Sequence, residues 1–334
     1  MYIDKRPVVG VTIGDPAGIG PEIVLKALLG SDIDSLADIV VIGDKTVLQC
    51  IIDLYHLNME INCIGQPSEG EYKKHVLNLI NLENIPDDFA FGKVDPLCGA
   101  AAFEYIKRSV DLALSGQIDS IATAPVNKEA LNKSGIHYIG QTEIFGALTN
   151  VSNPLTMFDT DGLRIFFLSS HMSIKQAIDA ISVRAIVSRV KECMPALQKF
   201  GCENPALAIA GLNPHSGENG LFGDEELRCI IPAVGILKAE GYNVFGPIPS
   251  DAVFHLAYCG KYDAVLSLYH DQGRIAAKTL NFEHTVALTN KLPFLRTSVD
   301  HGTAMEIAAK DRASSMNMQA AILKAIEYTP YYNQ

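Results

Sequence analysis

Short apolar runs alternate with longer amphipathic segments along the first part of the chain, as far as residue 130. Runs rich in Val and Ile are typical of buried strands, and amphipathic segments are typical of helices. Pro21 followed by Glu22 favours a helix start, because proline suits the first helical turn and an acid suits the dipole there. We predict strands over 8–13, 39–42 and 120–123, and helices over 21–29 and 99–114. Strands that alternate with helices predict βαβ units and a largely parallel sheet.

The pattern changes in the middle of the chain, where two apolar runs flank Asp161-Gly162. Asp-Gly between two β runs is a strong hairpin signal, so 155–160 and 163–169 are expected to pair as a hairpin. Further buried strands are predicted at 206–210 and 262–267, with a long amphipathic helix at about 224–239. A chain of 334 residues is long for one domain of ~100–200 residues, so two lobes are expected.

Composition excludes several classes of protein. The chain is 48% apolar and 19% charged, with a formal net charge of −11 and an isoelectric point near 5.3. An acidic chain without a run of Lys and Arg offers no surface for nucleic acid, although a local group of cations can still bind an anionic substrate. No apolar run approaches the ~20 residues of a membrane span. We therefore expect neither a nucleic-acid nor a membrane partner.

The seven cysteines indicate a reducing compartment. Their number is odd and no Cys-x-x-Cys pair occurs, so neither a disulfide framework nor a cysteine zinc site is predicted. The first apolar run begins at residue 8, which leaves no room for a signal peptide. The expected location is cytoplasmic.

Three histidines, His171, His215 and His270, each follow an apolar run that is predicted to be a strand. The gaps between them are 44 and 55 residues, far too wide for a zinc finger but suited to a site built from strand ends. Imidazole binds Zn²⁺, Co²⁺, Ni²⁺ or Mn²⁺, and three ligands leave positions open for a substrate. Taken singly, a histidine in such a place is more often a helix cap or a hydrogen-bonded loop residue than a metal ligand, and the case for a metal rests on the three together.

Three cations are candidates for binding an anionic substrate. Lys278 lies eight residues past His270, Arg296 follows the turn at 291–294, and Lys128 ends the segment 123–128. Cations close to a metal would suit a carboxylate and a phosphate on a small substrate, with Arg296 as a bidentate clamp. A lysine beside a metal can also transfer protons. The alternative for each is an ordinary surface charge.

The Gly18-Ile19-Gly20 turn lies between a predicted strand and a predicted helix, which is the setting of a nucleotide-binding loop. Asp44, at the end of the next strand, stands near the position of a ribose-binding acid. The third glycine position of that fingerprint is Ile23, whose side chain would hold helix and strand apart. Two alternatives remain: a tight turn that needs its glycines and, favoured here, a backbone-amide loop that lines the active-site cleft. Neither a Gly-x-Ser-x-Gly elbow nor a Walker loop occurs.

Six blocks of the chain resemble the 4-hydroxythreonine-4-phosphate dehydrogenase (PdxA) family. They are GDPAGIGPE at 14–22, TAPVNKE at 123–129, GQTE at 140–143, NPHSGENGLFGDEE at 213–226, YHDQG at 269–273 and LPFLRTSVDHGTA at 292–304. They occur in family order over essentially the whole chain. The sequence of residues 217–226 most resembles that of a paralogous branch that acts on 4-phospho-D-threonate or D-erythronate 4-phosphate.

The resemblance implies a two-lobed α/β/α fold with largely parallel sheets, like those of isocitrate and isopropylmalate dehydrogenases. A first lobe, residues 1–140 with 300–334, would form the nucleotide side. A second lobe, residues 141–299, would carry the metal-ligand histidines and the dimer interface, with the active site in the cleft between lobes. The family further implies a homodimer with shared active sites, NAD in preference to NADP, and a divalent metal (Zn, Co, Mn, Ni or Mg).

By the same resemblance, the metal ligands are His171, His215 and His270. Substrate contacts fall on Gln141, Thr142, Lys278, Ala287 and Arg296. The nucleotide loop falls on Asp300, His301, Gly302 and Thr303.

The expected reaction is the NAD-dependent oxidation of a 4-phosphorylated 3-hydroxy acid, with decarboxylation. The metal would chelate the C3 hydroxyl and the carboxylate, which promotes loss of the hydroxyl proton and hydride departure to NAD. The β-keto acid that forms can lose CO₂ because the metal stabilises the enolate. Lys278 is expected to transfer a proton, while Asp251 or Asp271 orients the metal ligands.

The chain departs from the family pattern at three positions. Gln141 replaces a usual His, Ala287 a usual Asn, and Lys291 a usual Gly. An amide donates a hydrogen bond but does not titrate, and alanine removes a polar substrate contact. We therefore expect weak or no turnover of 4-phosphohydroxy-L-threonine. The alternatives are a 4-phosphohydroxy-L-threonine dehydrogenase of pyridoxal phosphate biosynthesis, a dehydrogenase of cis-diol carboxylates, and a non-catalytic binding paralogue.

Overall fold

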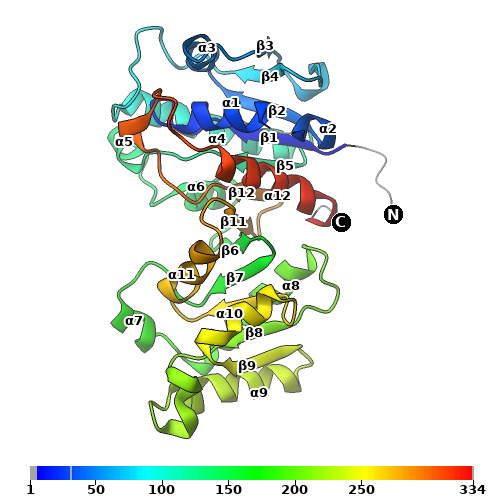
Figure 1. Cartoon of the computed structure of the whole chain (residues 1–334), viewed down its shortest axis with the longest axis vertical. Coiled ribbons are helices and arrows are strands. Elements are labelled where there is room, and N and C mark those ends of the chain that lie inside the picture. Colours follow the sequence, from blue (N-terminus) through cyan, green and yellow to red (C-terminus); the bar gives the residue numbers. More distant parts are fainter. Residues whose placement is uncertain (1–5, 31, 333–334) are drawn as a thin grey trace. The chain divides into compact units, whose positions relative to one another are not determined.

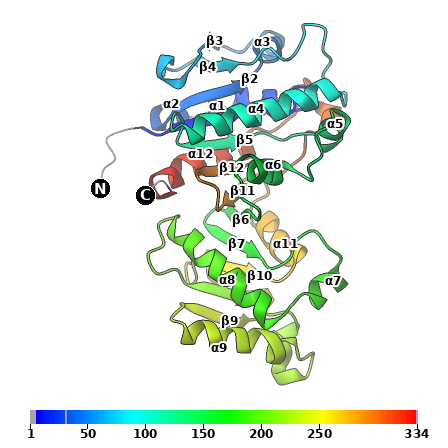
Figure 2. The same cartoon turned by 180° about the vertical axis from the view of Figure 1, so that it is seen from behind.

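A computed structural model describes residues 6–30 and 32–332, and the chain divides into two compact units (Figure 1). Unit 1 contains the chain up to Pro154 and the chain from Val286 onward, and unit 2 is Leu155–Thr285. In each unit mostly parallel strands are covered by helices on both faces, as Figures 1 and 2 show from opposite sides. The expected two-lobed α/β architecture is therefore confirmed.

The strands of unit 1 lie in the order β3-β4-β2-β1-β5-β12-β11, and all neighbours are parallel except β11 and β12. The strands are β1 (Val8–Thr12), β2 (Asp38–Gly43), β3 (Glu60–Cys63), β4 (Val76–Asn81), β5 (Ser120–Thr123), β11 (Thr285–Asn290) and β12 (Leu295–Ser298). The helices are α1 (Gly20–Leu29), α2 (Ile33–Leu36), α3 (Lys45–Leu54), α4 (Pro96–Leu114), α5 (Lys128–Lys133), α6 (Gln141–Leu148) and α12 (Met316–Tyr332), with short turns η1 (Pro67–Glu69) and η4 (Met305–Ile307).

The helices of unit 1 bury the central strands from two sides. Helix α1 contacts α3 and α12 on one face, and α4 contacts β1, β2 and β5 on the other (Figures 1 and 2). Strands covered on both faces are apolar along their whole length, because neither side faces water. This explains why 8–13, 39–42 and 120–123 read as continuous apolar runs rather than as alternating ones, and all three predicted strands are confirmed.

The strands of unit 2 lie in the order β6-β7-β10-β8-β9. They are β6 (Leu155–Thr160), β7 (Leu163–Phe167), β8 (Leu207–Ala210), β9 (Val244–Ile248) and β10 (Ala264–Ser267). The helical segments are α7 (Ile174–Asp179), α8 (Val183–Gln198), η2 (Pro214–Gly220), η3 (Glu226–Ile230), α9 (Ile231–Ala239), α10 (Ser250–Tyr258) and α11 (His270–Leu280). Strands β6 and β7 form the predicted hairpin, and Asp161 and Gly162 both adopt the positive φ that its tight turn requires.

Helix α8 contacts α9 and helix α10 contacts α11, and the two pairs cover opposite faces of unit 2 (Figures 1 and 2). One apolar core lies under α10 and α11, where Ile165, Val253, Val265 and Ala277 are among its buried members. The helix predicted at 224–239 is not uniform, because its first part, η3, is a π-helical turn. Pro232 has no N–H for the normal helical hydrogen bond, so the wider turn before it is the expected adjustment.

Two boundaries differ from the sequence prediction. The expected limits at 140/141 and 299/300 move to 154/155 and 285/286. Strand β12 pairs with β5, and α6 contacts α4, so the segments 141–154 and 286–299 belong to unit 1. In the part of the chain that the structure describes, no helix is both long and apolar enough to cross a membrane.

Candidate functional site

The three candidate histidines follow three neighbouring parallel strands of unit 2. Strand β10 pairs in parallel with β7 on one side and with β8 on the other. His171 follows β7, His270 follows β10, and His215 follows β8. The carboxyl ends of parallel strands lie at one edge of a sheet, so the three segments leave the sheet at the same edge, where open α/β sheets bind their ligands.

His171 and His270 lie side by side at this edge, with ring centroids 6.2 Å apart. Nδ1 of His270 is 2.6 Å from Oδ1 of Asp271, so this carboxylate holds one ring nitrogen and leaves Nε2 for another partner. Two imidazoles that bind one metal at about 2.1 Å place their ring centres roughly 5–6 Å apart. At 6.2 Å the His171–His270 pair stands slightly wider than this spacing, and the Asp271 carboxylate fixes the orientation of the His270 ring.

His215 lies in a strained turn. Residues 215–219 all have positive φ, and this left-handed conformation costs about 1–2 kcal/mol for each residue that is not glycine. The buried carboxylate of Glu226 accepts hydrogen bonds from the N–H groups of Leu212 (2.8 Å) and Asn213 (2.7 Å) and from Nδ2 of Asn213 (2.8 Å). Burial alone would raise the pKa of Glu226, but these hydrogen bonds outweigh it and lower the pKa. The ionised Glu226 carboxylate thus stabilises the loop that contains the strained turn. Backbone strain that is held in place by the surrounding structure is typical of functional loops.

The His215 ring faces Phe222, with ring centroids 6.4 Å apart. Over residues 6–30 and 32–332, no three His, Cys, Asp or Glu side chains gather closely enough to hold a metal ion. The structure thus brings two of the predicted ligands together and leaves the third on the neighbouring strand end. Metal binding by all three histidines stays a prediction.

Lys278 and the two candidate acids also belong to unit 2. Lys278 lies on α11, where it lines a surface hollow together with His270, Asp271 and Arg274, and its Nζ is 4.4 Å from the ring centroid of Phe282. Asp251 is exposed in the first turn of α10, which follows β9, the neighbour of β8. Of the two acids, Asp271 is the one that contacts a candidate ligand.

Arg296 on β12 is a buried charged residue of unit 1. Its side chain is buried, with an exposed fraction of 3%. Nε and Nη2 donate to Oγ1 of Thr123 at 3.2 and 2.7 Å, and Nη1 donates to Oγ1 of Thr289 at 3.0 Å and of Thr142 at 3.4 Å. Its Cζ is 5.1 Å from the ring centroid of Phe145. All of these partners are neutral.

A buried cation among neutral groups is electrostatically uncompensated. Burial lowers the pKa of Arg296 from 12.5 to about 9, so the guanidinium is still charged at neutral pH. Taking an ion out of water costs several kcal/mol unless an opposite charge compensates it. A carboxylate or a phosphate would supply that charge, and guanidinium binds either one in a bidentate way. The surroundings of Arg296 therefore fit an anionic ligand.

Other predicted substrate contacts lie close to Arg296 in unit 1. Gln141 precedes Thr142 at the start of α6, and its Nε2 donates to the carbonyl of Ala124 at 3.0 Å while its Oε1 is buried without a hydrogen-bond partner. Ala287 lies on the same face of β11 as Thr289, which is paired with Arg296. Lys128 is exposed at the start of α5. Thr142 thus contacts Arg296, Gln141 is the chain neighbour of Thr142, and Ala287 shares a strand face with Thr289, whereas Lys278 lies in the other unit.

The candidate nucleotide loop packs against the Gly-rich turn. The N–H of Ile19 donates to the carbonyl of Thr303 at 3.0 Å, and Nδ2 of Asn127 lies 3.4 Å from Oγ1 of Thr303. A Cβ on Gly18 would come within 2.9 Å of Cβ of Thr303, so glycine is needed for this close approach. Nδ1 of His301 lies 2.9 Å from the carbonyl oxygen of Gly302. The N–H of Asp300 donates a hydrogen bond to Oδ1 of Asn317 at 2.8 Å.

The Gly-rich turn itself is internal, which differs from the favoured expectation. Residues 11–20 are buried, and the N–H groups of Asp15, Ala17 and Ile19 all donate within the chain. These amides are not open to a ligand, so the structure supports the tight-turn alternative. Asp44 is structural as well, since it accepts hydrogen bonds from the N–H of Asn84 and from the Tyr105 hydroxyl.

Replacing Gly20 with alanine is expected to lower the free energy of unfolding by about 3 kcal/mol, because the new Cβ would overlap the carbonyl oxygen of Ile13. Urea denaturation measures this change. Gly235 is a matched control inside α9, where an added Cβ meets nothing within 4 Å. There alanine should be neutral or stabilising by about 0.5–1 kcal/mol. Equal effects at the two sites would contradict the close approach at Gly20.

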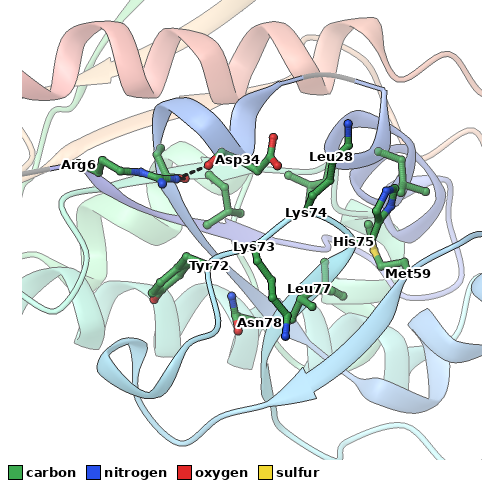
Figure 3. Close-up of a pocket in the computed structure, with 14 residues that line it drawn as sticks. Arg6, Leu28, Asp34, Met59, Tyr72, Lys73, Lys74, His75, Leu77 and Asn78 are labelled. Carbon is green, nitrogen blue, oxygen red and sulfur yellow. Dashed lines mark hydrogen bonds between the residues drawn. The ribbon is translucent and has the colours of Figure 1, made fainter.

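Unit 1 also has a cavity, which Figure 3 shows, at the amino ends of β2 and β4. Arg6, Asp34, Tyr72, Lys73 and His75 are among the side chains around it, and Arg6 donates to the carbonyl of Asp34. Thr123, which holds Arg296, stands at the carboxyl end of β5. The cavity therefore lies at the opposite strand edge from the Arg296 site.

Sequence reasoning missed several residues that build these sites. Thr123 and Thr289 hold the Arg296 guanidinium, and Glu226 holds the His215 turn. Threonine in a strand and glutamate before a helix are common, so their types alone carry no signal. The sequence feature that could have pointed to them is their position in or beside the family blocks that also contain the candidate residues.

Comparison with known proteins identifies the family. A family model described as "Pyridoxal phosphate biosynthetic protein PdxA" matches residues 35–325. A protein of Clostridium botulinum strain Hall, named "Putative D-threonate 4-phosphate dehydrogenase", is 47% identical over 333 residues, which are 99% of this chain and 100% of that one. A protein of the same name from Fusobacterium nucleatum is 49% identical over 328 residues, 98% of each chain.

A crystal structure of 4-hydroxythreonine-4-phosphate dehydrogenase from Klebsiella pneumoniae superposes with a TM-score of 0.90 at 38% identity, covering 98% of this chain and 99% of that one. These relatives are all named as dehydrogenases, and their similarity extends over the full length of the chain. The chain belongs to the PdxA family of dehydrogenases.

Proposed function

We propose that this protein is an NAD- and divalent-metal-dependent dehydrogenase that oxidises and decarboxylates a 4-phosphorylated 3-hydroxy acid, of the D-threonate 4-phosphate or D-erythronate 4-phosphate type. The observation that carries the proposal is the buried Arg296 guanidinium, which has only neutral partners and so calls for an anionic group on the substrate. The names of the 47% and 49% identical relatives support D-threonate 4-phosphate.

In this proposal the unit 1 residues bind the anionic end of the substrate. Arg296 supplies the charge, Thr142 and Thr289 orient the guanidinium, and Lys128 adds a second cation nearby. Phe145 covers the guanidinium from one side, which excludes water and strengthens the ionic contact. Asp300, His301, Gly302 and Thr303 form the proposed nucleotide loop, held by the Gly-rich turn through Ile19.

The unit 2 residues act on the hydroxy-acid end. His171, His215 and His270 would hold the divalent metal, which would supply positive charge beside the hydroxyl oxygen, and NAD would serve as the hydride acceptor. Asp271 fixes the His270 ring through Nδ1, which leaves Nε2 as the nitrogen that would bind the metal. Lys278, along the same hollow, would take the hydroxyl proton and return a proton to carbon after CO₂ leaves.

A homodimer with shared active sites is part of the same proposal. Among the residues that the structure describes, one copy forms no three-ligand group, so a second copy would complete it. The histidine segments also expose large apolar side chains, including Met172 (46%), Ile174 (62%) and Leu221 (71%). Exposed apolar patches of this kind are typical of protein contact surfaces.

D-Threonate 4-phosphate should give NADH with this protein, and 4-phosphohydroxy-L-threonine should give kcat/KM at least about 10²-fold lower, since Gln141 and Ala287 alter the pocket. NADH absorbance with both compounds measures the ratio. Replacing Gln141 with His and Ala287 with Asn together should narrow it. Robust NADH production from 4-phosphohydroxy-L-threonine by the unmodified protein would refute the substrate assignment. Equal turnover of D-threonate without its phosphate would favour the cis-diol carboxylate alternative.

A further inference from the structure

The amide of Gln272 joins two of the segments of unit 2 that lead to candidate metal ligands, those of His270 and His215, to the segment that leads to Asp251. Gln272 is the third residue of α11 and stands two residues after His270. Its Oε1 accepts hydrogen bonds from the N–H of Leu268 at 2.7 Å and from Oγ of Ser267 at 3.0 Å. Its Nε2 donates to the carbonyl of Gly211 at 2.8 Å and to Oγ of Ser250 at 2.9 Å.

The chemistry of these partners assigns the two ends of the amide. A backbone N–H is only a donor and a carbonyl oxygen only an acceptor, so Oε1 must face Leu268 and Nε2 must face Gly211. Four contacts use both lone pairs of the oxygen and both protons of the nitrogen. A side chain with all of its hydrogen-bonding capacity used in one geometry has little freedom to move.

Each partner of Gln272 is close in the chain to a candidate residue. Leu268 precedes His270 by two residues. Gly211 directly follows β8, and a Cβ added to it would be 2.8 Å from Oγ of Ser216, the neighbour of His215. Ser250 precedes Asp251 and also donates to the carbonyl of Gly211 at 2.5 Å. One amide therefore links the segments of His270, His215 and Asp251.

The third histidine segment is joined through Leu268. The carbonyl of Leu268 accepts a hydrogen bond from Oγ of Ser169 at 2.9 Å, and the N–H of Leu168 donates to the carbonyl of Ser267 at 2.8 Å. Ser169 precedes His171 by two residues. The backbone of Leu268 is thus held by Gln272 at its N–H and by the His171 segment at its carbonyl.

We propose that Gln272 is a positioning residue that ties the segments of His171, His215 and His270 to one another, so that each copy presents its ligands in the arrangement that a metal shared between copies requires. This rests on the proposed function. Metal sites need their ligands held by surrounding hydrogen bonds, and mutation of such outer partners weakens metal binding by about 10–100-fold. Gln272 is no ligand itself, since its four hydrogen-bonding positions are occupied within the chain.

Gln272→Glu separates positioning from charge. Glutamate keeps the size of the side chain and still accepts hydrogen bonds from Leu268 and Ser267, but it has no donor for Gly211, and its second oxygen would face that carbonyl. Charge alone predicts the opposite result, because an added carboxylate close to a metal attracts the cation. If Gln272 acts by positioning the ligand segments, Gln272→Glu should bind the metal more weakly despite the added negative charge.

The experiment titrates the metal-free full-length protein with Co²⁺ and follows both affinity and the visible absorption bands, which report ligand geometry. We expect Gln272→Glu to weaken Co²⁺ binding about 10–100-fold and to change the band positions. Gln198→Glu, which adds the same charge at an exposed position of α8, should bind as the unmodified protein does. Equal or tighter binding by Gln272→Glu with unchanged bands would overturn the proposal.

Two further outcomes are distinguishable. If the unmodified protein binds no Co²⁺ in a way that depends on His215, the proposed function fails before Gln272 is tested. If Gln272→Glu does not fold, Ser250→Ala replaces it, because it removes one acceptor of the amide and leaves the Gly211 contact. Its Co²⁺ affinity should fall by less than that of Gln272→Glu, and an unchanged affinity and spectrum would then count against the proposal.

Discussion

Replacing Arg296 with methionine should reduce kcat/KM on the order of 10³-fold and leave the protein folded. The loss is expected because the anionic group of the substrate would lose its one buried cation, and truncating one member of a buried charge pair costs about 2–5 kcal/mol. Steady-state NADH production measures the activity, and the fall should appear mainly in KM if Arg296 binds the ground state and the transition state equally.

The stability of the Arg296→Met protein, unlike its activity, should change little. Methionine is similar in length and carries no charge, so the desolvation penalty of the Arg296 guanidinium disappears. Three threonine hydroxyls lose a donor, at about 1 kcal/mol each, so the two effects nearly cancel. We expect the free energy of unfolding in urea to change by less than about 1 kcal/mol.

Arg312→Met is the matched control, since Arg312 is exposed in the same unit and should tolerate the change in both measurements. A structural role for Arg296 would instead give a loss of unfolding free energy of about 3 kcal/mol or more, as seen when a buried ion pair is broken. That result would argue against an anion site.

His215→Ala should remove both bound metal and turnover. A catalytic metal held by three imidazoles does not stay bound to two, and without it the hydroxyl oxygen loses its stabilising charge, so kcat should fall on the order of 10³-fold. The metal content of the purified protein and its NADH production measure the two effects. A variant that kept both would contradict the assignment of the histidines.

His255→Ala is the matched control for this test. His255 is exposed on α10 of the same unit, where its ring lies beside Cys259. Its loss should leave metal content and activity unchanged. The strain in the 215–219 turn gives a further check, because His215→Ala keeps that backbone and should retain cooperative unfolding.

Shared active sites can be tested with two inactive variants. If His171 and His215 of one site come from different copies, a mixture of His171→Ala and His215→Ala contains heterodimers with one intact site. After exchange of subunits, activity should recover to about a quarter of the unmodified level, because half of the dimers are mixed and each has one of two sites. If each copy builds its own site, no activity returns.

Much of the fold could be predicted because its signals are local. Asp161-Gly162 predicted a hairpin from the backbone preferences of two residues, and the runs at 39–42 and 120–123 predicted buried strands from their own composition. The position of each histidine after a strand was visible in the same way. The sequence blocks shared with the family indicated which residues belong to the candidate site, because long blocks in a fixed order are specific to one family.

The remainder depended on contacts between distant segments. Arg296 looked like any surface cation, and only the packing of β5, α6 and β11 around it shows a buried charge among threonines. The same is true of the Gly-rich segment 14–20, where the N–H of Asp15 donates to Pro125 and the N–H of Ile19 donates to Thr303, residues far along the chain. The unit boundaries moved because β12 pairs with β5, a partner 175 residues earlier (Leu295 with Ser120) that no local pattern specifies.

By itself the sequence determined the βαβ elements, the family, and the placement of three histidines at strand ends, because each depends on residue type and short-range order. Only the tertiary structure decided that those three strands are neighbours, that His171 and His270 stand 6.2 Å apart, and that Arg296 is a buried, uncompensated cation. Strand order, burial and electrostatic compensation depend on segments that are far apart in the sequence and meet only in the fold. The local pattern of residue types therefore does not predict them.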